Sequence, residues 1–274
     1  MNLPHGLPRT WLALVVVVSV GCVSPAAQFD ERAAALGLRR IVVTGAGFPH
    51  VLYRKTGAPT PTLHVYIDGD GTPWIGSQPA ADPTPRNPLM LQLTALDPVP
   101  AVYVGRPCYH GTAAFSPCSA RLWTRGRYSS EVLVSLSTVV RQLMAQEGYA
   151  RVAWFGHSGG GTIAVLLAER FPETVALVTI AANLDTAAWA AYAGQEDLSG
   201  SLNPAAMPPL SPRIQQRHYA GGKDRIVLPV LTASVAGRLG APLRVIDDYD
   251  HHLCCWEQIW PRILNELSGE GRMQ

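Results

Sequence analysis

The pentapeptide GHSGG at residues 156–160 places a serine at the junction of two expected elements. It follows the apolar run 151–155 and precedes a helix-like stretch at 162–170. On such a strand-to-helix turn a serine is held in a strained conformation with its hydroxyl facing outward, and flanking glycines avoid clashes where strand and helix converge. Ser158 is therefore a candidate nucleophile, although in a chain with 25 glycines the pattern can also mark an ordinary turn.

A serine hydroxyl is a poor nucleophile at neutral pH, so it needs a histidine to take its proton and a carboxylate to orient that histidine. Two downstream loops offer both groups. Asp224 lies in the glycine-opened loop GGKDRIV, directly after a strand-like run. The sequence DHH at 250–252 follows a further apolar run, so His251 or His252 supplies the base. Asp185, in the loop after an earlier strand, is the alternative acid.

With these residues in the order Ser, Asp, His, the chain resembles serine hydrolases of the α/β-hydrolase fold, and among them the bacterial exported or lipoprotein-type hydrolases. The resemblance covers most of the sequence after about residue 40. It implies Ser158 as nucleophile, Asp224 as acid and His251 as base, because similar sequences keep a histidine directly after the aspartate and before CCW; His252 is the alternative. It also implies that no metal or organic cofactor is needed.

Acyl transfer further requires N–H donors for the negative charge that develops on the carbonyl oxygen. One donor is expected to be the backbone N–H of Gly159. The second normally comes from the loop after an earlier strand, and here the run 63–67 leads into DGDG at 68–71, which resembles the HGG-type loop with aspartate in place of histidine. We place this donor at Asp70, with Gly71 as the alternative. An acidic turn or a calcium-loop fragment is the competing interpretation.

The order of apolar runs and helical stretches indicates how these loops are positioned. It predicts an α/β fold with a mostly parallel eight-stranded sheet and helices on both faces. The strongest helix is 130–147, where apolar residues recur at three- and four-residue steps. Residues 226–239 and 261–267 indicate further crossover helices. The expected strands are 40–44, 50–54, 63–67, 99–104, 152–155, 175–180, 215–220 and 243–246.

A stretch at 183–212 is rich in alanine, proline and small polar residues. It falls where related hydrolases insert a cap over the active site. A segment of this length can form only one or two short helices, so a small cap is expected. Within it, Trp189 and Tyr192 either line an acyl pocket or simply cover the core.

Length and composition fit one catalytic domain. A chain of 274 residues with 47% apolar residues can bury one sizeable core. The net charge of +2 and the lack of a basic stripe argue against nucleic acid as a partner. The expected partner is a small-molecule ester or acyl substrate, cleaved through an acyl-enzyme on Ser158. A peptidase or amidase using the same triad, and a catalytically silent envelope binding protein, are the alternatives.

Residues 1–21 have the character of a signal peptide. His5 and Arg9 precede the apolar run 11–20, which has the length of a signal-peptide core and is too short to span a bilayer comfortably. We therefore expect export, and we expect the folded domain to exclude this segment.

Gly21-Cys22 resembles the lipoprotein processing site, with Ser19 where leucine is usual. Lipidation of Cys22 would attach the protein to the periplasm-facing membrane, whereas ordinary signal cleavage would leave it periplasmic or secreted, and an uncleaved anchor is the third possibility. Residues 22–39 are then a linker or N-terminal segment, and the α/β-hydrolase domain spans 40–268.

Export allows disulfide bonds to form and persist. Of the five cysteines, four remain when Cys22 is assigned to lipid. Cys108 and Cys118 flank one short loop, and their pairing is favoured, worth roughly 2 to 3 kcal/mol in the chain-entropy model. Cys254 and Cys255 are adjacent and form a vicinal bridge, pair with the first two, or stay reduced. A metal site with the neighbouring histidines competes with this interpretation, but zinc ligands usually have an intervening spacer.

Overall fold

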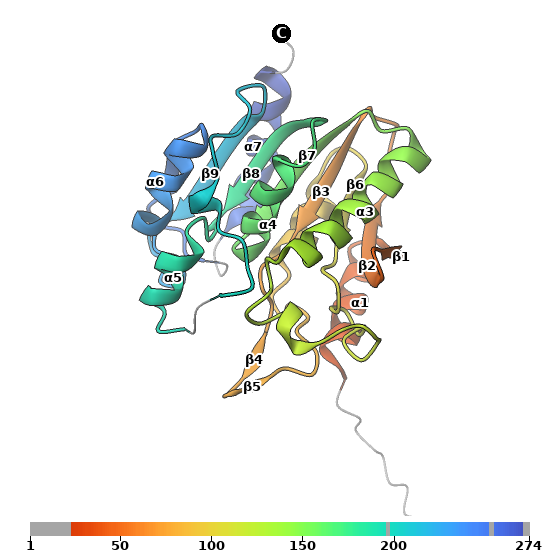
Figure 1. The fold of residues 1–274 in the computed structure, drawn as a ribbon. Helices are drawn as coiled ribbons and strands as arrows, with labels where there is room; N and C mark the ends of the chain where they lie inside the picture. The colour runs from red at the N-terminus through yellow and green to blue at the C-terminus, as the bar shows by residue number, and fades with distance from the viewer. Residues whose placement is uncertain (1–22, 196–197, 252–254, 271–274) are drawn as a thin grey trace, which may run out of the picture.

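The computed structural model describes residues 23–195, 198–251 and 255–270. The chain alternates between strands and helices over most of this length (Figure 1). In chain order the elements are α1 (Pro25–Ala35), β1 (Arg39–Gly45), β2 (Phe48–Lys55), β3 (Thr62–Ile67), β4 (Trp74–Ile75), β5 (Gln78–Pro79), α2 (Leu89–Leu96), β6 (Ala101–Val104), the short 3₁₀ helix η1 (Ala120–Leu122), α3 (Ser130–Glu147), β7 (Arg151–His157), α4 (Gly159–Ala168), β8 (Thr174–Ile180), α5 (Thr186–Tyr192), the 3₁₀ helix η2 (Pro204–Ala206), β9 (Gln215–Gly221), α6 (Pro229–Leu239), β10 (Leu243–Ile246) and α7 (Trp256–Glu270).

Eight strands form the main sheet in the order β1-β2-β6-β3-β7-β8-β9-β10. β2 runs antiparallel to both of its neighbours, β1 and β6. All pairs from β6 to β10 are parallel. β4 and β5 form a separate small hairpin in the connection after β3. The mostly parallel eight-stranded sheet predicted from the sequence is confirmed, and β7, which leads to Ser158, lies in its interior between β3 and β8.

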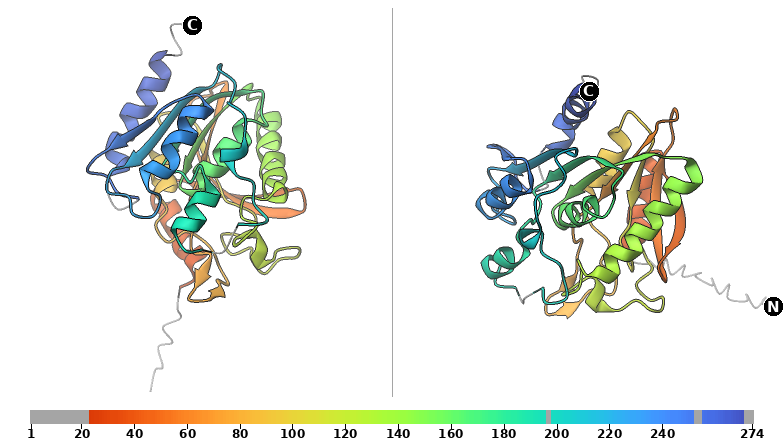
Figure 2. Two further views of the ribbon diagram at one scale, coloured as in Figure 1. Left: turned by 60° about the vertical axis from the view of Figure 1, so that its left-hand side comes forward. Right: turned by 45° about the horizontal axis from the view of Figure 1, so that its top comes forward.

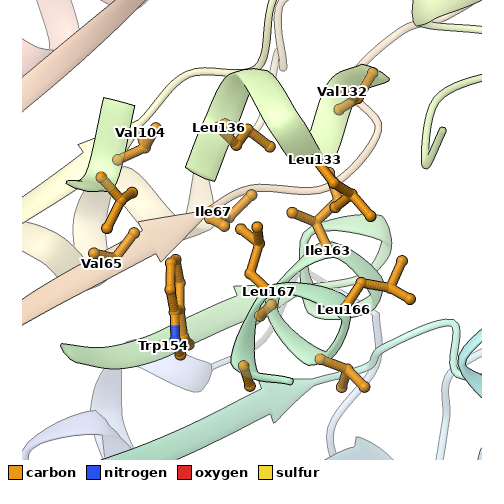
Figure 3. Packing of buried hydrophobic residues seen from close by; sticks show 14 of the residues in the cluster. Val65, Ile67, Val104, Val132, Leu133, Leu136, Trp154, Ile163, Leu166 and Leu167 are labelled. Atoms are coloured by element: carbon orange, nitrogen blue, oxygen red, sulfur yellow. The ribbon is translucent and has the colours of Figure 1, made fainter. Parts of the chain in front are cut away.

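Successive strand residues point to opposite faces of the sheet, and apolar side chains on both faces are buried. Helices therefore cover both faces. On one face α3, α4 and α6 pack over residues that include Ile67 and Trp154. Figure 3 shows Leu136 of α3 and Leu167 of α4 in that layer. On the opposite face α1, α2 and α7 pack over a second set that includes Tyr66. The two helical layers can be followed in the turned views of Figure 2.

Helix α1 packs on the sheet and so lies within the folded region, outside the bounds of 40–268 that the sequence predicts for the domain. Ser24 caps the helix by accepting a hydrogen bond from the Ala27 N–H at 3.2 Å. Phe29 is 1% exposed, and its ring centroid lies 5.1 Å from that of Tyr53 and 5.3 Å from that of Tyr103. The N-terminal helix therefore completes one face of the sheet.

The cap between β8 and β9 is small, as expected, and contains α5 and η2. Asn203 ties its two parts together, since its Oδ1 accepts a hydrogen bond from the Thr186 N–H at 3.0 Å. Trp189 of α5 donates its indole N–H to the carbonyl of Ile226 at 2.9 Å. The cap is thereby attached to the loop that carries Asp224.

Cys108 and Cys118 form a disulfide, which confirms the favoured pairing and excludes bridges from either of them to the adjacent cysteine pair. Cys255 is also disulfide-bonded, so it does not stay reduced. Cys254, the lipidation site Cys22 and the signal peptide lie outside the described residues. Within the described chain, the helices are too short or too polar to cross a bilayer.

Three buried histidines, His50, His110 and His218, predict that acid destabilises the fold. Burial lowers the pKa of His50 and His218 to about 4 and that of His110 to about 3. The unfolded chain binds protons at these sites near pH 6.5, whereas the folded protein does not until much lower pH. The contribution of these histidines to the free energy of unfolding should therefore be complete above about pH 6.5 and should be lost progressively as the pH drops toward about 4.

Urea unfolding at a series of pH values between about 7.5 and 5 measures this effect. The urea concentration at the unfolding midpoint should fall steadily as the pH is lowered, and this fall should be smaller in His218→Gln. A wild-type midpoint that stays constant over this interval would contradict the prediction.

Candidate active site

Ser158 occupies the turn between β7 and α4. Its φ is +52° and its ψ −125°, a backbone conformation that residues other than glycine rarely adopt. The N–H of Ser158 donates to the carbonyl of Ile180 at 2.9 Å, and its carbonyl accepts from the N–H groups of Gly161 and Thr162 at 3.0 and 3.3 Å. The strained turn expected from the pentapeptide is therefore present at the carboxyl end of β7.

Neighbouring backbone and side-chain atoms make glycine necessary around this turn. A Cβ atom on Gly156 would lie 2.4 Å from the carbonyl oxygen of Gly160, and one on Gly160 would lie 2.1 Å from that of Ile67. A Cβ atom on Gly159 would lie 2.0 Å from a carboxylate oxygen of Asp70. Each separation is far below van der Waals contact, so side chains here would push apart the strand, the helix and the DGDG loop.

Asp224 and His251 are hydrogen-bonded to each other. His251 Nδ1 lies 2.8 Å from Asp224 Oδ2, and the two residues are 7% and 2% exposed, His251 being the more exposed. Asp224 Oδ1 accepts hydrogen bonds from the N–H groups of Ile226 at 2.8 Å and Val227 at 2.9 Å. In this pairing Nδ1 is the donor and the carboxylate the acceptor, which in the neutral imidazole makes Nε2 the basic nitrogen.

The alternative acid, Asp185, has a different position. It is the N-cap of α5, where its Oδ1 accepts from the N–H of Ala188 and from the side-chain amide of Asn203, both at 3.1 Å. The carboxylate that accepts the hydrogen bond from His251 is that of Asp224. The alternative base, His252, lies outside the described residues.

His157, for which the sequence predicts no role, contacts the main chain of the candidate base. Its Nε2 lies 2.8 Å from the carbonyl oxygen of His251, so this nitrogen is the donor. The two imidazole rings are 4.9 Å apart, and His157 is 5% exposed. On the other side of the ring, Nδ1 lies 3.6 Å from Asp68 Oδ1. Its place directly before Ser158 was the only signal in the sequence.

A cavity of about 500 Å³ brings the candidate residues together at the carboxyl ends of the strands. Ser158 and His251 both line it, and so does the loop 68–74. Trp74, Trp189 and Ile226 supply apolar and aromatic surface. The remaining lining residues are Pro85, Arg86, Asn87, Arg127, His157 and Gln195.

The Asp70 carboxylate, whose side chain is 16% exposed, is held by two arginines and a tyrosine. Arg106 Nη1 and Arg127 Nη1 each lie 2.8 Å from one of its oxygens, and the Tyr128 hydroxyl lies 2.7 Å from Oδ2. The Tyr109 hydroxyl donates to the main-chain carbonyl of Asp70 at 3.0 Å. Burial alone would raise the pKa of Asp70, but Arg127 and Arg106 lower it to about 2. The residue is thus anionic at neutral pH, and its charge is satisfied within the protein.

The backbone N–H groups expected to stabilise an oxyanion remain available. Among the hydrogen bonds formed within the described chain, none is donated by the N–H of Gly159 or of Asp70. Gly159 is the first residue of α4, where the N–H groups have no partner inside the helix. Gly69 also approaches the serine, since a Cβ atom on it would lie 3.2 Å from the Cβ of Ser158.

No family model matches the sequence, and no curated protein matches it either. Solved structures, in contrast, have a similar fold. A putative lipase (lip1) from Acinetobacter baumannii AYE is 14% identical with a TM-score of 0.60, over 92% of this chain and 99% of that chain. An α/β serine hydrolase without lid from Xanthomonas campestris is 16% identical with a TM-score of 0.54, over 86% and 94%. A proline iminopeptidase-related protein from Thermus thermophilus is 15% identical with a TM-score of 0.56, over 85% and 96%.

At these identities the likeness shows the fold alone. The chain has the α/β-hydrolase fold, as the order of its motifs predicted.

Proposed function

We propose that this α/β-hydrolase-fold protein is a serine hydrolase that cleaves carboxylic esters through an acyl-enzyme on Ser158. The observation that carries the proposal is the hydrogen bond between His251 and Asp224 beside a cavity that Ser158 also lines. Ser158 lies on a strained strand-to-helix turn, which exposes a nucleophile in this fold. No metal or cofactor is part of the proposed chemistry.

The proposed reaction uses each group in turn. His251 Nε2 accepts the hydroxyl proton as Ser158 Oγ attacks the acyl carbon, while Asp224 holds the protonated Nδ1 and stabilises the imidazolium that forms. The N–H groups of Gly159 and Asp70 bind the oxygen on which negative charge develops. His251 then gives its proton to the leaving alcohol. Water then attacks the acyl-enzyme, with His251 taking its proton and passing it to Ser158 Oγ, and the acid is released.

The cavity supports a small-molecule substrate. Its volume of about 500 Å³ lies in the range of sites that enclose such ligands. Trp74 and Trp189 offer flat apolar surface for an acyl or alcohol group, and the short cap leaves little chain to cover a long one. We therefore propose esters of short or medium length as the substrate class.

A screen of p-nitrophenyl esters of graded acyl length, run beside aminoacyl anilides, tests this function. We expect the highest kcat/KM for short or medium esters and a decline for long chains, because the cavity cannot enclose them. Turnover confined to the anilides would replace the proposal with a peptidase or amidase. No turnover of either class would favour a binding protein that retains the fold.

We also propose that the protein works outside the cytoplasm. The Cys108–Cys118 disulfide supports this, since disulfides form and persist mainly in oxidising compartments. Cys22 remains the proposed lipid attachment site that would hold the protein at the periplasm-facing membrane. Mass spectrometry of the N-terminus of protein purified from the membrane fraction would decide between lipidation and simple cleavage.

A further inference from the structure

We infer that the side chain of Asp70 is the positioning group of the oxyanion hole: held by Arg106, Arg127 and Tyr128, it fixes its own backbone N–H opposite that of Gly159. The inference rests on the proposed function. It assigns a task to the carboxylate itself, whereas the proposed reaction uses only the main-chain N–H of the same residue.

The first support is the position of the carboxylate between the two donor segments. Asp70 Oδ1 occupies a point 2.0 Å from where a Cβ atom of Gly159 would stand, and the Tyr128 hydroxyl lies 2.5 Å from the same point. The carboxylate therefore packs directly against the first residue of α4. A shift of the DGDG loop toward or away from the helix would change the gap between the two N–H groups.

The second support is the completeness of the clamp. Three donors hold the carboxylate, and two more hold the adjoining main chain: Tyr109 donates to the Asp70 carbonyl at 3.0 Å, and Arg106 Nη2 to the Asp68 carbonyl at 3.2 Å. The four clamping residues are between 0% and 5% exposed. Such a network restrains the loop through the Asp70 side chain and through the main-chain carbonyls of Asp68 and Asp70.

The third support is electrostatic. A bare carboxylate beside an oxyanion hole would oppose the negative charge of the transition state. The guanidinium groups of Arg106 and Arg127 neutralise Asp70, so the loop can use a strong acceptor as its anchor without that penalty. Asparagine or serine would accept fewer charge-assisted hydrogen bonds and hold the loop less tightly.

All four clamping residues come from one connection. Arg106, Tyr109, Arg127 and Tyr128 lie between the end of β6 and the start of α3, and the Cys108–Cys118 disulfide closes a loop within that connection. The segment therefore acts as a single bracket that holds the oxyanion loop against α4.

Tyr128→Phe tests the inference with little change in volume. We expect kcat for the best p-nitrophenyl ester to fall about tenfold or more with KM nearly unchanged, because only the transition state carries the oxyanion. Tyr109→Phe should have a smaller effect in the same direction. The matched control is Tyr53→Phe, which also removes a buried tyrosine hydroxyl from a carboxylate, that of Asp30 at 2.6 Å; neither Tyr53 nor Asp30 lines the cavity. It should lose stability and keep both kinetic constants.

A boronic acid that forms a tetrahedral adduct on the serine supplies the second readout. Its inhibition constant should rise for Tyr128→Phe by about the factor by which kcat falls, and stay constant for Tyr53→Phe. Asp70→Asn should show the largest kcat loss if it folds; because it leaves two buried guanidinium groups uncompensated, the tyrosine variants decide the question.

Folded Tyr128→Phe and Tyr109→Phe proteins with wild-type kcat and boronate affinity would overturn the inference while leaving the hydrolase function intact. A wild-type protein that hydrolyses no ester or amide and binds no boronate would overturn the proposed function and this inference with it.

Discussion

Ser158→Ala is expected to lower ester turnover by about six orders of magnitude, the loss seen when the nucleophile of a serine triad is removed. Alanine keeps the Cβ atom that the turn already accommodates at φ +52°, so the fold should survive the change. Only the hydroxyl that would attack the acyl carbon is lost. The residual rate would come from the oxyanion donors and from substrate binding.

A fluorophosphonate probe tests the same prediction without a known substrate. The wild type should be labelled at residue 158, and the alanine variant should not be labelled at all. Thermal unfolding and circular dichroism of the variant provide the control for folding. Equal labelling of both proteins, or an unlabelled wild type, would refute Ser158 as the nucleophile.

Asp224→Asn is expected to lower kcat by about 10⁴-fold, because an amide can donate a hydrogen bond to Nδ1 and so stabilise the wrong tautomer of His251. Asp224 Oδ1 also accepts two backbone N–H groups, and the carbonyl of asparagine can retain these bonds. The loop should therefore keep its shape while the imidazole is held in the tautomer that cannot accept the serine proton. Substrate KM should change little.

Asp185→Asn is the matched control for this experiment. Asp185 caps α5, and asparagine is as good an N-cap as aspartate, so stability and kcat should both remain close to wild type. Steady-state kinetics of the two variants against the same ester compare the two candidate acids directly. A large loss in Asp185→Asn with a small loss in Asp224→Asn would reverse the assignment.

The sheet was largely predictable because each of its strands is a local signal. Buried strands such as β7 and β8 contain continuous apolar runs, and α3 has a clear helical period. Helix boundaries were less accurate. α4 begins at Gly159, whereas the sequence indicated Thr162, because three consecutive glycines carry low helix propensity and conceal a helix that the fold imposes.

Two further helices gave weak signals. α1 begins at a proline and shows only a narrow apolar face, with Ala26, Phe29 and Ala33 as its buried residues. Its stability comes from packing on the tyrosines of the sheet, which a local pattern cannot reveal. α2 is apolar on most sides and only eight residues long, so its period is hidden.

In the candidate site, the motif residues were predictable and their supports were not. Ser158, Asp224 and His251 stand in short motifs that follow strands, and the hydrogen bond between the last two agrees with that order. The two arginines that hold Asp70 follow it in the sequence by 36 and 57 positions, so no local pattern indicates the contact. The contact of His157 with the His251 carbonyl spans 94 positions and depends on the same long-range convergence.

The Cys108–Cys118 disulfide makes the segment that holds Asp70 dependent on the redox state of its surroundings. Before the bridge forms, the connection that supplies both arginines is a longer and freer chain, and the oxyanion loop has a looser anchor. Under the proposed export, a newly made chain in a reducing compartment would be a poor catalyst until an oxidising compartment allows the bridge to form.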